Sequence, residues 1–178
     1  MIQLFGIALL SFALSAAPQV RDAPAPAVTF RIKHLGIAVD GSFSDLQTSI
    51  RFDPARLAES SLEASVAVNT IQTGIALRDR HLQKKGYFDA EQYPRIRLVS
   101  KRIRPEGGHQ YVGTFELTIR DVTREVTVPF TYAPKGSAGR FEGNFTINRR
   151  DFGVGGGSLV LADEVKVFIA VEASQQPF

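Results

Sequence analysis

The chain has 178 residues, with 21 Lys or Arg and 18 Asp or Glu, and its formal net charge is +3 with neutral histidines. Apolar residues make up 44% and charged residues 22%, which is typical of one globular domain and excludes a disordered chain. Because cysteine is absent, disulfides, iron–sulfur clusters, cysteine-based zinc sites and a thiol nucleophile are excluded.

Residues 1–17 have the pattern of a signal peptide. The apolar stretch from Leu4 to Leu14 is shorter than the roughly 20 residues of a spanning helix. The small residues at 15–17 suit signal peptidase, although no Lys or Arg precedes the apolar stretch. An uncleaved N-terminal anchor is the alternative. We predict cleavage after Ala17, and therefore a periplasmic or secreted protein.

Residues 18–27 are rich in Pro and Ala and are predicted to form an extended linker. From residue 28 onward, apolar and polar residues alternate with the period of two that half-buried strands show. Nine segments carry this alternation, and some of them could be one strand bent in two: 28–33, 36–43, 46–53, 62–69, 95–104, 111–120, 125–132, 141–148 and 164–172. The predicted domain, residues 28–178, is all-β, an extended antiparallel up-and-down β-barrel of about eight strands like that of the lipocalins.

One segment departs from the alternation. Residues 75–86 read IALRDRHLQKKG, with Ile75, Leu77 and Leu82 on roughly one side and Gly86 at the end. This spacing predicts a helix of about three turns, inserted between two strands.

Motifs of the common enzyme classes are missing from the sequence. The three histidines, at 34, 81 and 109, stand in different predicted elements without metal-ligand spacing. No nucleophile elbow, phosphate loop or dinucleotide fingerprint occurs. The glycine-rich residues 153–157 lack the Lys and the helix that a phosphate loop needs, so we interpret them as a connection between strands. We therefore predict no catalytic residues, no metal and no enzymatic cofactor.

Basic residues are concentrated in one part of the chain. Residues 78–104 contain nine Lys or Arg and three Asp or Glu. Such a region could face an anionic lipid head group or make a transient contact with a membrane surface, or it could be a solvated face of helix and strand. Predicted export and the lack of a recognition motif argue against nucleic acid.

Three small residues lie on the otherwise bulky apolar faces of the predicted strands: Ala64, Gly113 and Gly143. Small side chains there could leave a lumen, as in eight-stranded barrels that hold one ligand. Alternatively, the rings of Phe115 and Phe145 fill the space, or the glycines mark bends.

Several short motifs occur in a distinctive order. They are FxIKH at 30–34, GSF at 41–43, RDxHL at 78–82, FD at 88–89, YP at 93–94, LTI at 117–119 and RDFG at 150–153. Across about residues 28–173 this order resembles the YceI-like family of polyisoprenoid-binding proteins. The resemblance implies a lipocalin-like barrel whose lumen holds a long apolar chain, in a protein exported by bacteria, and it implies no catalytic set.

We therefore predict an exported carrier of an isoprenoid-type lipid, either a polyprenyl phosphate or a quinone tail, with no other cofactor. Strand parity predicts that the lumen is lined by Phe52, Val66, Val68, Phe115, Leu117, Phe145 and Val167. Arg78 is a candidate donor to a polar head group and His81 a candidate hydrogen-bond partner, whereas Asp79 is expected to be structural.

Two other functions stay open at this stage. A quinone-linked redox partner or enzyme would need a titratable group aimed at the quinone, for which His81 is the best candidate. A solid barrel could instead act as an interaction module. The sequence also leaves a homodimer open.

Overall fold

A computed structural model of the protein describes residues 27–136 and 138–174. The predicted signal peptide and residues 18–26 of the predicted linker lie outside this range. The described chain forms nine strands: β1 (Val28–His34), β2 (Ile37–Phe43), β3 (Leu46–Arg51), β4 (Ser61–Ala67), β5 (Arg95–Gly107), β6 (Gln110–Ile119), β7 (Val122–Lys135), β8 (Ala138–Asn148) and β9 (Leu161–Ser174). One α-helix, α1 (Ala76–Leu82), and two short 3-10 turns, η1 (Val68–Thr70) and η2 (Arg149–Phe152), complete it.

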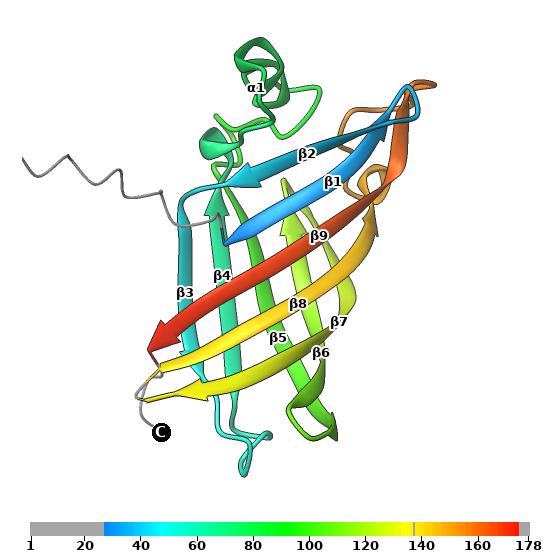
Figure 1. The fold of residues 1–178 in the computed structure, drawn as a ribbon. Helices are drawn as coiled ribbons and strands as arrows, with labels where there is room; N and C mark the ends of the chain where they lie inside the picture. The colour runs from blue at the N-terminus through cyan, green and yellow to red at the C-terminus, as the bar shows by residue number, and fades with distance from the viewer. Residues whose placement is uncertain (1–26, 137, 175–178) are drawn as a thin grey trace, which may run out of the picture.

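The nine strands form one antiparallel sheet in the order β2-β1-β9-β8-β7-β6-β5-β4-β3. From β3 to β9 each strand pairs with its neighbours in the sequence, and β1 pairs with both β2 and β9. The sheet curls strongly around an interior (Figure 1). The predicted up-and-down architecture is therefore confirmed, with nine strands in place of about eight.

The two edges of the curled sheet, β2 and β3, are consecutive in the chain. Only Ser44 and Asp45 separate them. Strands β2 and β3 are thus two halves of one bent strand. The first half, β2, pairs with β1, where Phe43 opposes Val28. The second half, β3, pairs with β4, where Leu46 opposes Val66. Within the described residues β2 and β3 form no ladder with each other, so the predicted barrel takes the form of a strongly curled half-barrel.

The bend between β2 and β3 is held by Asp45. Its carboxylate accepts a hydrogen bond of 2.8 Å from Nη1 of Arg95, and its carbonyl oxygen accepts one from the backbone N–H of Ala67 at 3.3 Å. These contacts attach the bend to β4 and β5, which explains why an alternating pattern from 36 to 53 gives two strands.

The helix is shorter than predicted, because α1 has 7 residues. Beyond it the chain forms tight turns, in which the N–H of Lys84 bonds to the carbonyl of His81 and the N–H of Tyr87 to that of Lys84. Ile75 and Leu77, which the pattern places on the apolar side, are 54% and 70% exposed. The segment thus lacks the buried stripe that would sustain a longer helix.

The end of the barrel opposite α1 is filled by aromatic rings. Phe52 is 1% exposed, and four ring centroids lie within 4.8–6.0 Å of its own, those of Tyr111, Phe130, Tyr132 and Phe141. Above this cluster, a Cβ on Gly113 would stand 2.2 Å from Cε2 of Phe115. The ring of Phe115 therefore occupies the space that Gly113 leaves, so at this position an aromatic ring, and not a lumen, fills the gap.

The outer face of the sheet carries charged pairs between strands. Asp40 accepts a 2.6 Å hydrogen bond from Nε of Arg31, and this bond lowers the pKa of the carboxyl. Glu172 lies against Lys135 and Arg140, and the hydrogen bond from Lys135 is the main cause of its lowered pKa. The outer face of the sheet is therefore the solvated face that the alternation predicts. Among residues 27–136 and 138–174, no helix has the length and apolar character needed to cross a bilayer.

Candidate binding cavity

A cavity of about 500 Å³ lies inside the curled sheet, in the half nearer α1. Its wall includes four successive inward positions of β1, namely Val28, Phe30, Ile32 and His34. Six residue steps of roughly 3.3 Å each give this wall a length of about 20 Å. Most of the remaining lining is aliphatic or aromatic. It comes from β2, from the inner faces of β4, β5, β6, β8 and β9, and from the segments around α1 and before β9.

The polar lining residues are confined to the mouth of the cavity, around α1 and the connection from η2 to β9. They are His34, Thr73, Arg78, His81, Arg149 and Ser158. The cavity therefore has a long apolar body and a polar opening, an arrangement suited to a ligand with an apolar chain and a polar end.

The structure places six of the nine predicted site residues on this cavity: Val66, Arg78, His81, Leu117, Phe145 and Val167. The other three lie elsewhere. Phe115 lines a smaller cavity, and Phe52 is enclosed in the aromatic cluster. Val68 is 1% exposed and opens η1 after the end of β4, with its N–H bonded to the carbonyl of Pro94.

Phe52 and Val68 lie off the larger cavity for two different reasons. Phe52 follows the last residue of β3, and Val68 follows the last residue of β4. Neither side chain is among those lining the two cavities. Phe52 keeps the inward parity of Ile50 but lies at the level of the aromatic cluster, which parity does not encode, and parity within β4 does not extend to Val68 in η1.

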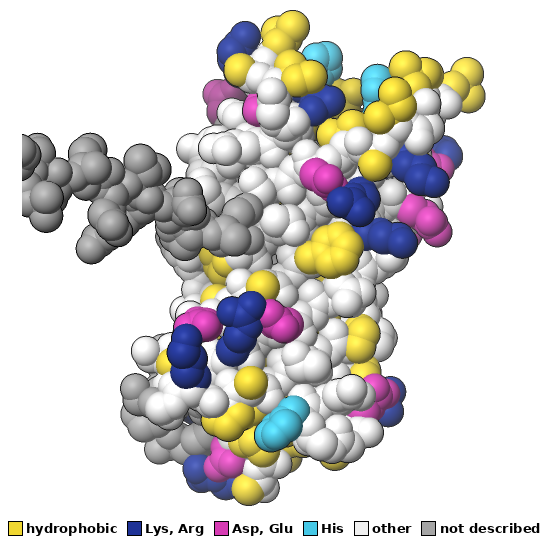
Figure 2. Space-filling view, in the orientation of Figure 1, with side chains coloured by type: hydrophobic (Ala, Val, Ile, Leu, Met, Phe, Trp, Pro, Cys, Tyr) yellow, Lys and Arg dark blue, Asp and Glu magenta, His cyan; other side chains and the backbone are white. Residues whose placement is uncertain are grey.

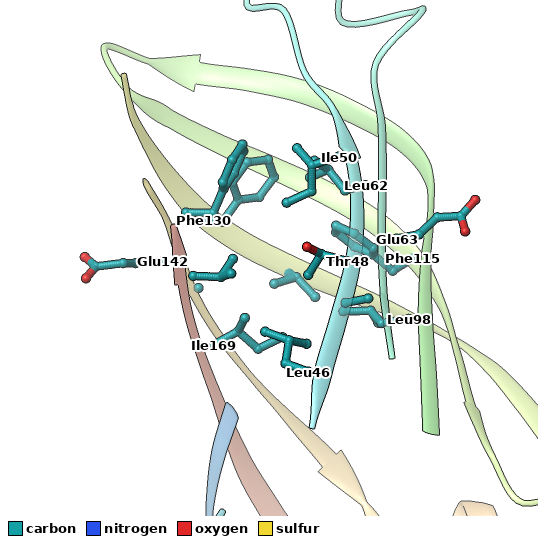
Figure 3. Close-up of a pocket in the computed structure, with 15 residues that line it drawn as sticks. Leu46, Thr48, Ile50, Leu62, Glu63, Leu98, Phe115, Phe130, Glu142 and Ile169 are labelled. Atoms are coloured by element: carbon teal, nitrogen blue, oxygen red, sulfur yellow. The ribbon is translucent and has the colours of Figure 1, made fainter. Parts of the chain in front are cut away.

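The smaller cavity, of about 70 Å³, lies between β3 and β9 (Figure 3). Leu46, Thr48 and Ile50 line it from β3, and Ile169 and Val171 line it from β9. Glu63 and Glu142 also border this space, but their carboxylates point away from it (Figure 3).

This gap arises because β1 begins at Val28, opposite Ile169 of β9. Ala27 adds one further bond to β9, from the N–H of Ala170. Strands β6 and β9 line both cavities. On β6, Phe115 faces the smaller cavity and Leu117, two residues on, faces the larger. On β9, Ile169 faces the smaller cavity and Val167 the larger. The two cavities are therefore successive levels of one interior.

Arg78 and Asp79 both hold the segment that enters α1. Nε of Arg78 donates to the hydroxyl of Thr73 at 2.7 Å, and Nη2 donates to the Thr73 carbonyl at 2.5 Å. Oδ1 of Asp79 accepts from the backbone N–H of Thr73 at 2.9 Å and from its hydroxyl at 2.5 Å. The structural role expected for Asp79 is therefore present, and Arg78 shares it.

His81 stands at the opening, exposed to solvent. Its ring meets that of Tyr87 edge to face, with centroids 5.0 Å apart. His34, which ends β1, lines the same mouth, whereas His109 lies in the turn between β5 and β6. Within the described ranges, no three His, Asp or Glu side chains come together as a metal site would require.

Arg149 supports the mouth of the cavity, and its structural role was not evident from the sequence. It is 3% exposed, and all five of its N–H groups are hydrogen-bonded at 2.7–3.1 Å. The acceptors are the carbonyls of Val154, Gly156, Leu161 and Ala162 and the carboxylate of Asp163. Arg149 therefore organises the glycine-rich connection that forms one side of the mouth, and no donor remains for a ligand.

Gly155 is packed tightly in the same connection. Its φ is +73°, and a Cβ there would stand 2.9 Å from Cε1 of Tyr87 and 3.1 Å from Nη1 of Arg149. A glycine is therefore required where this connection crosses Tyr87 and Arg149. The sequence showed the run of glycines but not this contact.

Comparison with known proteins identifies the family. A YceI-like domain matches residues 20–173. A UPF0312 protein of Photorhabdus laumondii is 31% identical over 157 residues, which cover 84% of this chain and 81% of that protein. The crystal structure of Burkholderia cenocepacia BcnA has a TM-score of 0.78 and 32% identity, covering 83% of this chain and 95% of that one.

The same fold occurs in a more distant protein, a polyisoprenoid binding domain from Saccharophagus degradans. Its TM-score is 0.65 at 13% identity, over 86% of this chain and 97% of that one. The family comparison thus confirms the resemblance that the motif order indicated, and the curled nine-stranded sheet is shared with these solved structures. The chain belongs to the YceI-like family.

Proposed function

We propose that the protein is exported and carries a long-chain isoprenoid-type lipid, a polyprenyl phosphate or a quinone tail, in the larger cavity. The observation that carries this proposal is the shape and lining of the cavity, about 500 Å³ with an apolar body and a polar mouth. The Saccharophagus degradans domain, which has the same fold, is described as polyisoprenoid binding, and this supports the choice of ligand class.

The energetics of burial favour such a ligand. A chain that removes on the order of 400 Å² of apolar surface from water gains about 10 kcal/mol at roughly 25 cal/mol per Å². Association costs at least about 4 kcal/mol in lost freedom of motion. The difference, at most about 6 kcal/mol, corresponds to a dissociation constant of tens of micromolar or weaker.

The direct experiment is mass spectrometry of lipid extracted from protein purified natively without detergent. We expect a prenyl lipid in the extract of the unaltered protein. Val167→Trp should reduce the bound lipid about tenfold or more, because the indole ring fills space that the chain needs. Val167 lines the cavity near the middle of β9.

Lys166→Trp is the matched control, since Lys166 is the exposed neighbour of Val167 on the outer face of β9. It should leave the lipid content unchanged. Equal lipid content in both variants, each shown to be folded by circular dichroism, would contradict a lipid in the cavity. An unaltered protein that neither yields a prenyl lipid nor takes one up would refute the function itself.

The head-group role of Arg78 needs a control for its contacts with Thr73. If Arg78 meets a phosphate, Arg78→Ala should weaken binding of a polyprenyl phosphate by about 10-fold to 100-fold and leave a neutral quinone nearly unaffected. Thr73→Val removes the hydroxyl that Arg78 and Asp79 bind and retains the arginine charge. Equal losses for both lipids in Arg78→Ala, matched by Thr73→Val, would make Arg78 purely structural.

Export is tested independently of the ligand. N-terminal analysis of the protein recovered from the periplasm or the medium should give Pro18 as the first residue, as the pattern of residues 1–17 predicts. Intact Met1 on soluble protein would contradict cleavage and leave the binding proposal untouched.

A further inference from the structure

Exposed apolar side chains are concentrated at one end of the molecule. Seven large apolar residues are exposed in the described chain, and six of them lie at the cavity mouth: Leu35, Ile37, Ile75, Leu77, Leu159 and Val160. Leu77 is 70% exposed and Leu159 is fully exposed. Hydrophobic side chains gather on the two projections at the top of Figure 2, over α1 and over the turn between β1 and β2.

These two projections flank the opening of the cavity. Ile75 and Leu77 of the α1 projection, and Val160 of the other, line the cavity as well as facing solvent. The N–H of Leu35 donates to the carbonyl of Val160 at 2.7 Å, which fastens the β1–β2 turn to the connection before β9. The apolar crown, as we name these six residues, therefore surrounds the entrance and is held by the fold.

Positive charge accompanies the apolar crown. The three segments that carry it, 33–39, 75–86 and 153–160, contain five basic residues and one acidic residue. The basic residues are Lys33, Arg78, Arg80, Lys84 and Lys85. The acidic one, Asp79, is bound to Thr73. The net charge of these three segments, five basic residues minus one acidic residue, is therefore +4, compared with +3 for the whole chain.

We propose that the mouth of the barrel docks on an anionic lipid bilayer. The apolar crown enters the interfacial layer and the surrounding basic side chains contact lipid phosphates. This inference rests on the proposed function, because a bilayer is the solvent from which an isoprenoid-type lipid enters the cavity.

A bilayer fits the surface better than a protein partner does. The apolar side chains stand on two separate projections with an opening between them, which a fluid surface can meet without a complementary shape. The basic residues complement anionic head groups. Docked in this way, the cavity would open directly into the lipid, so the apolar chain could pass between them without crossing water.

The test is co-sedimentation of the full exported protein with vesicles of phosphatidylcholine, with and without phosphatidylglycerol. We expect binding that is stronger with phosphatidylglycerol. The double variant Ile37→Gln/Leu159→Gln, at two crown residues that do not line the cavity, should weaken binding about 100-fold, at roughly tenfold for each side chain withdrawn from the interface. Phe168→Gln is the control, since Phe168 is 41% exposed on the outer wall of β9.

The charge contribution is tested by a second pair of variants. Arg80→Gln/Lys84→Gln/Lys85→Gln should abolish most of the gain from phosphatidylglycerol, at about fivefold for each charge. Lys101→Gln/Arg102→Gln/Arg104→Gln removes the same charge from β5 and should not. If both triple variants lose the gain equally, or if Phe168→Gln weakens binding as much as the double variant, the docking orientation is wrong.

Binding of the apolar probe N-phenyl-1-naphthylamine in vesicle-free solution separates this inference from the proposed function. The crown variants should bind the probe as the unaltered protein does. Probe binding without vesicle binding would overturn the docking and leave the cavity function standing. Vesicle binding that depends on the crown, without entry of the probe, would support the docking and refute the cavity function.

Discussion

Replacing Arg149 with methionine is expected to lower the free energy of unfolding by about 3–5 kcal/mol. Arg149 is 3% exposed, and its guanidinium binds four carbonyls and the carboxylate of Asp163. Methionine retains much of the volume and none of the donors, so these buried acceptors lose their partners. Denaturation by urea, monitored by circular dichroism, measures the change.

The neighbouring Arg150→Met is the matched control. The side chain of Arg150 is 57% exposed and lies 3.4 Å from the same Asp163 carboxylate. Loss of a surface pair of this kind costs about 0–1 kcal/mol. Equal destabilisation by the two variants would contradict an organising role for Arg149 in the connection from η2 to β9.

Replacing Phe52 with alanine is the second large effect, with an expected loss of about 3–5 kcal/mol. Phe52 is at the centre of the aromatic cluster that closes the lower end of the barrel, where the Tyr132 centroid lies 4.8 Å away and that of Tyr111 5.1 Å away. Its removal leaves a cavity that these rings fill only in part. The midpoint and slope of urea unfolding report the loss.

Phe168→Ala, on the outer wall, is the control for Phe52→Ala and should reduce the free energy of unfolding far less, because Phe168 is 41% exposed.

The milder variant Phe52→Leu tests whether Phe52 belongs to the lipid-binding site. It should retain the lipid content of the unaltered protein, since Phe52 does not line the larger cavity. A loss of lipid in folded Phe52→Leu would show that Phe52 contacts the bound lipid after all.

The alternation of apolar and polar residues was sufficient to predict the strands and their inward faces. Val66, Leu117, Phe145 and Val167 all point into the interior, as their parity requires. Parity is local, because each side chain takes its face from its own strand. It contains no information on the level at which the side chain lies along the barrel.

That level is set by the register between strands. Phe115 and Leu117 share a face of β6, yet one lines the smaller cavity and the other the larger. Which interior positions are filled and which are empty depends on side chains brought together from distant strands. Gly113 shows this, since its space is occupied by the ring of Phe115.

The sequence by itself determined an all-β chain with one inserted helical segment, the inward face of most strands and the motif order of the family. Only the tertiary structure decided where the barrel is solid and where it is hollow, the burial of Arg149 among backbone carbonyls, and the exposure of Ile75 and Leu77 at the mouth. The physical reason is that strand formation depends on neighbours in the chain. A cavity and its entrance, by contrast, are spaces between elements, such as β1 and β9, that lie more than a hundred residues apart.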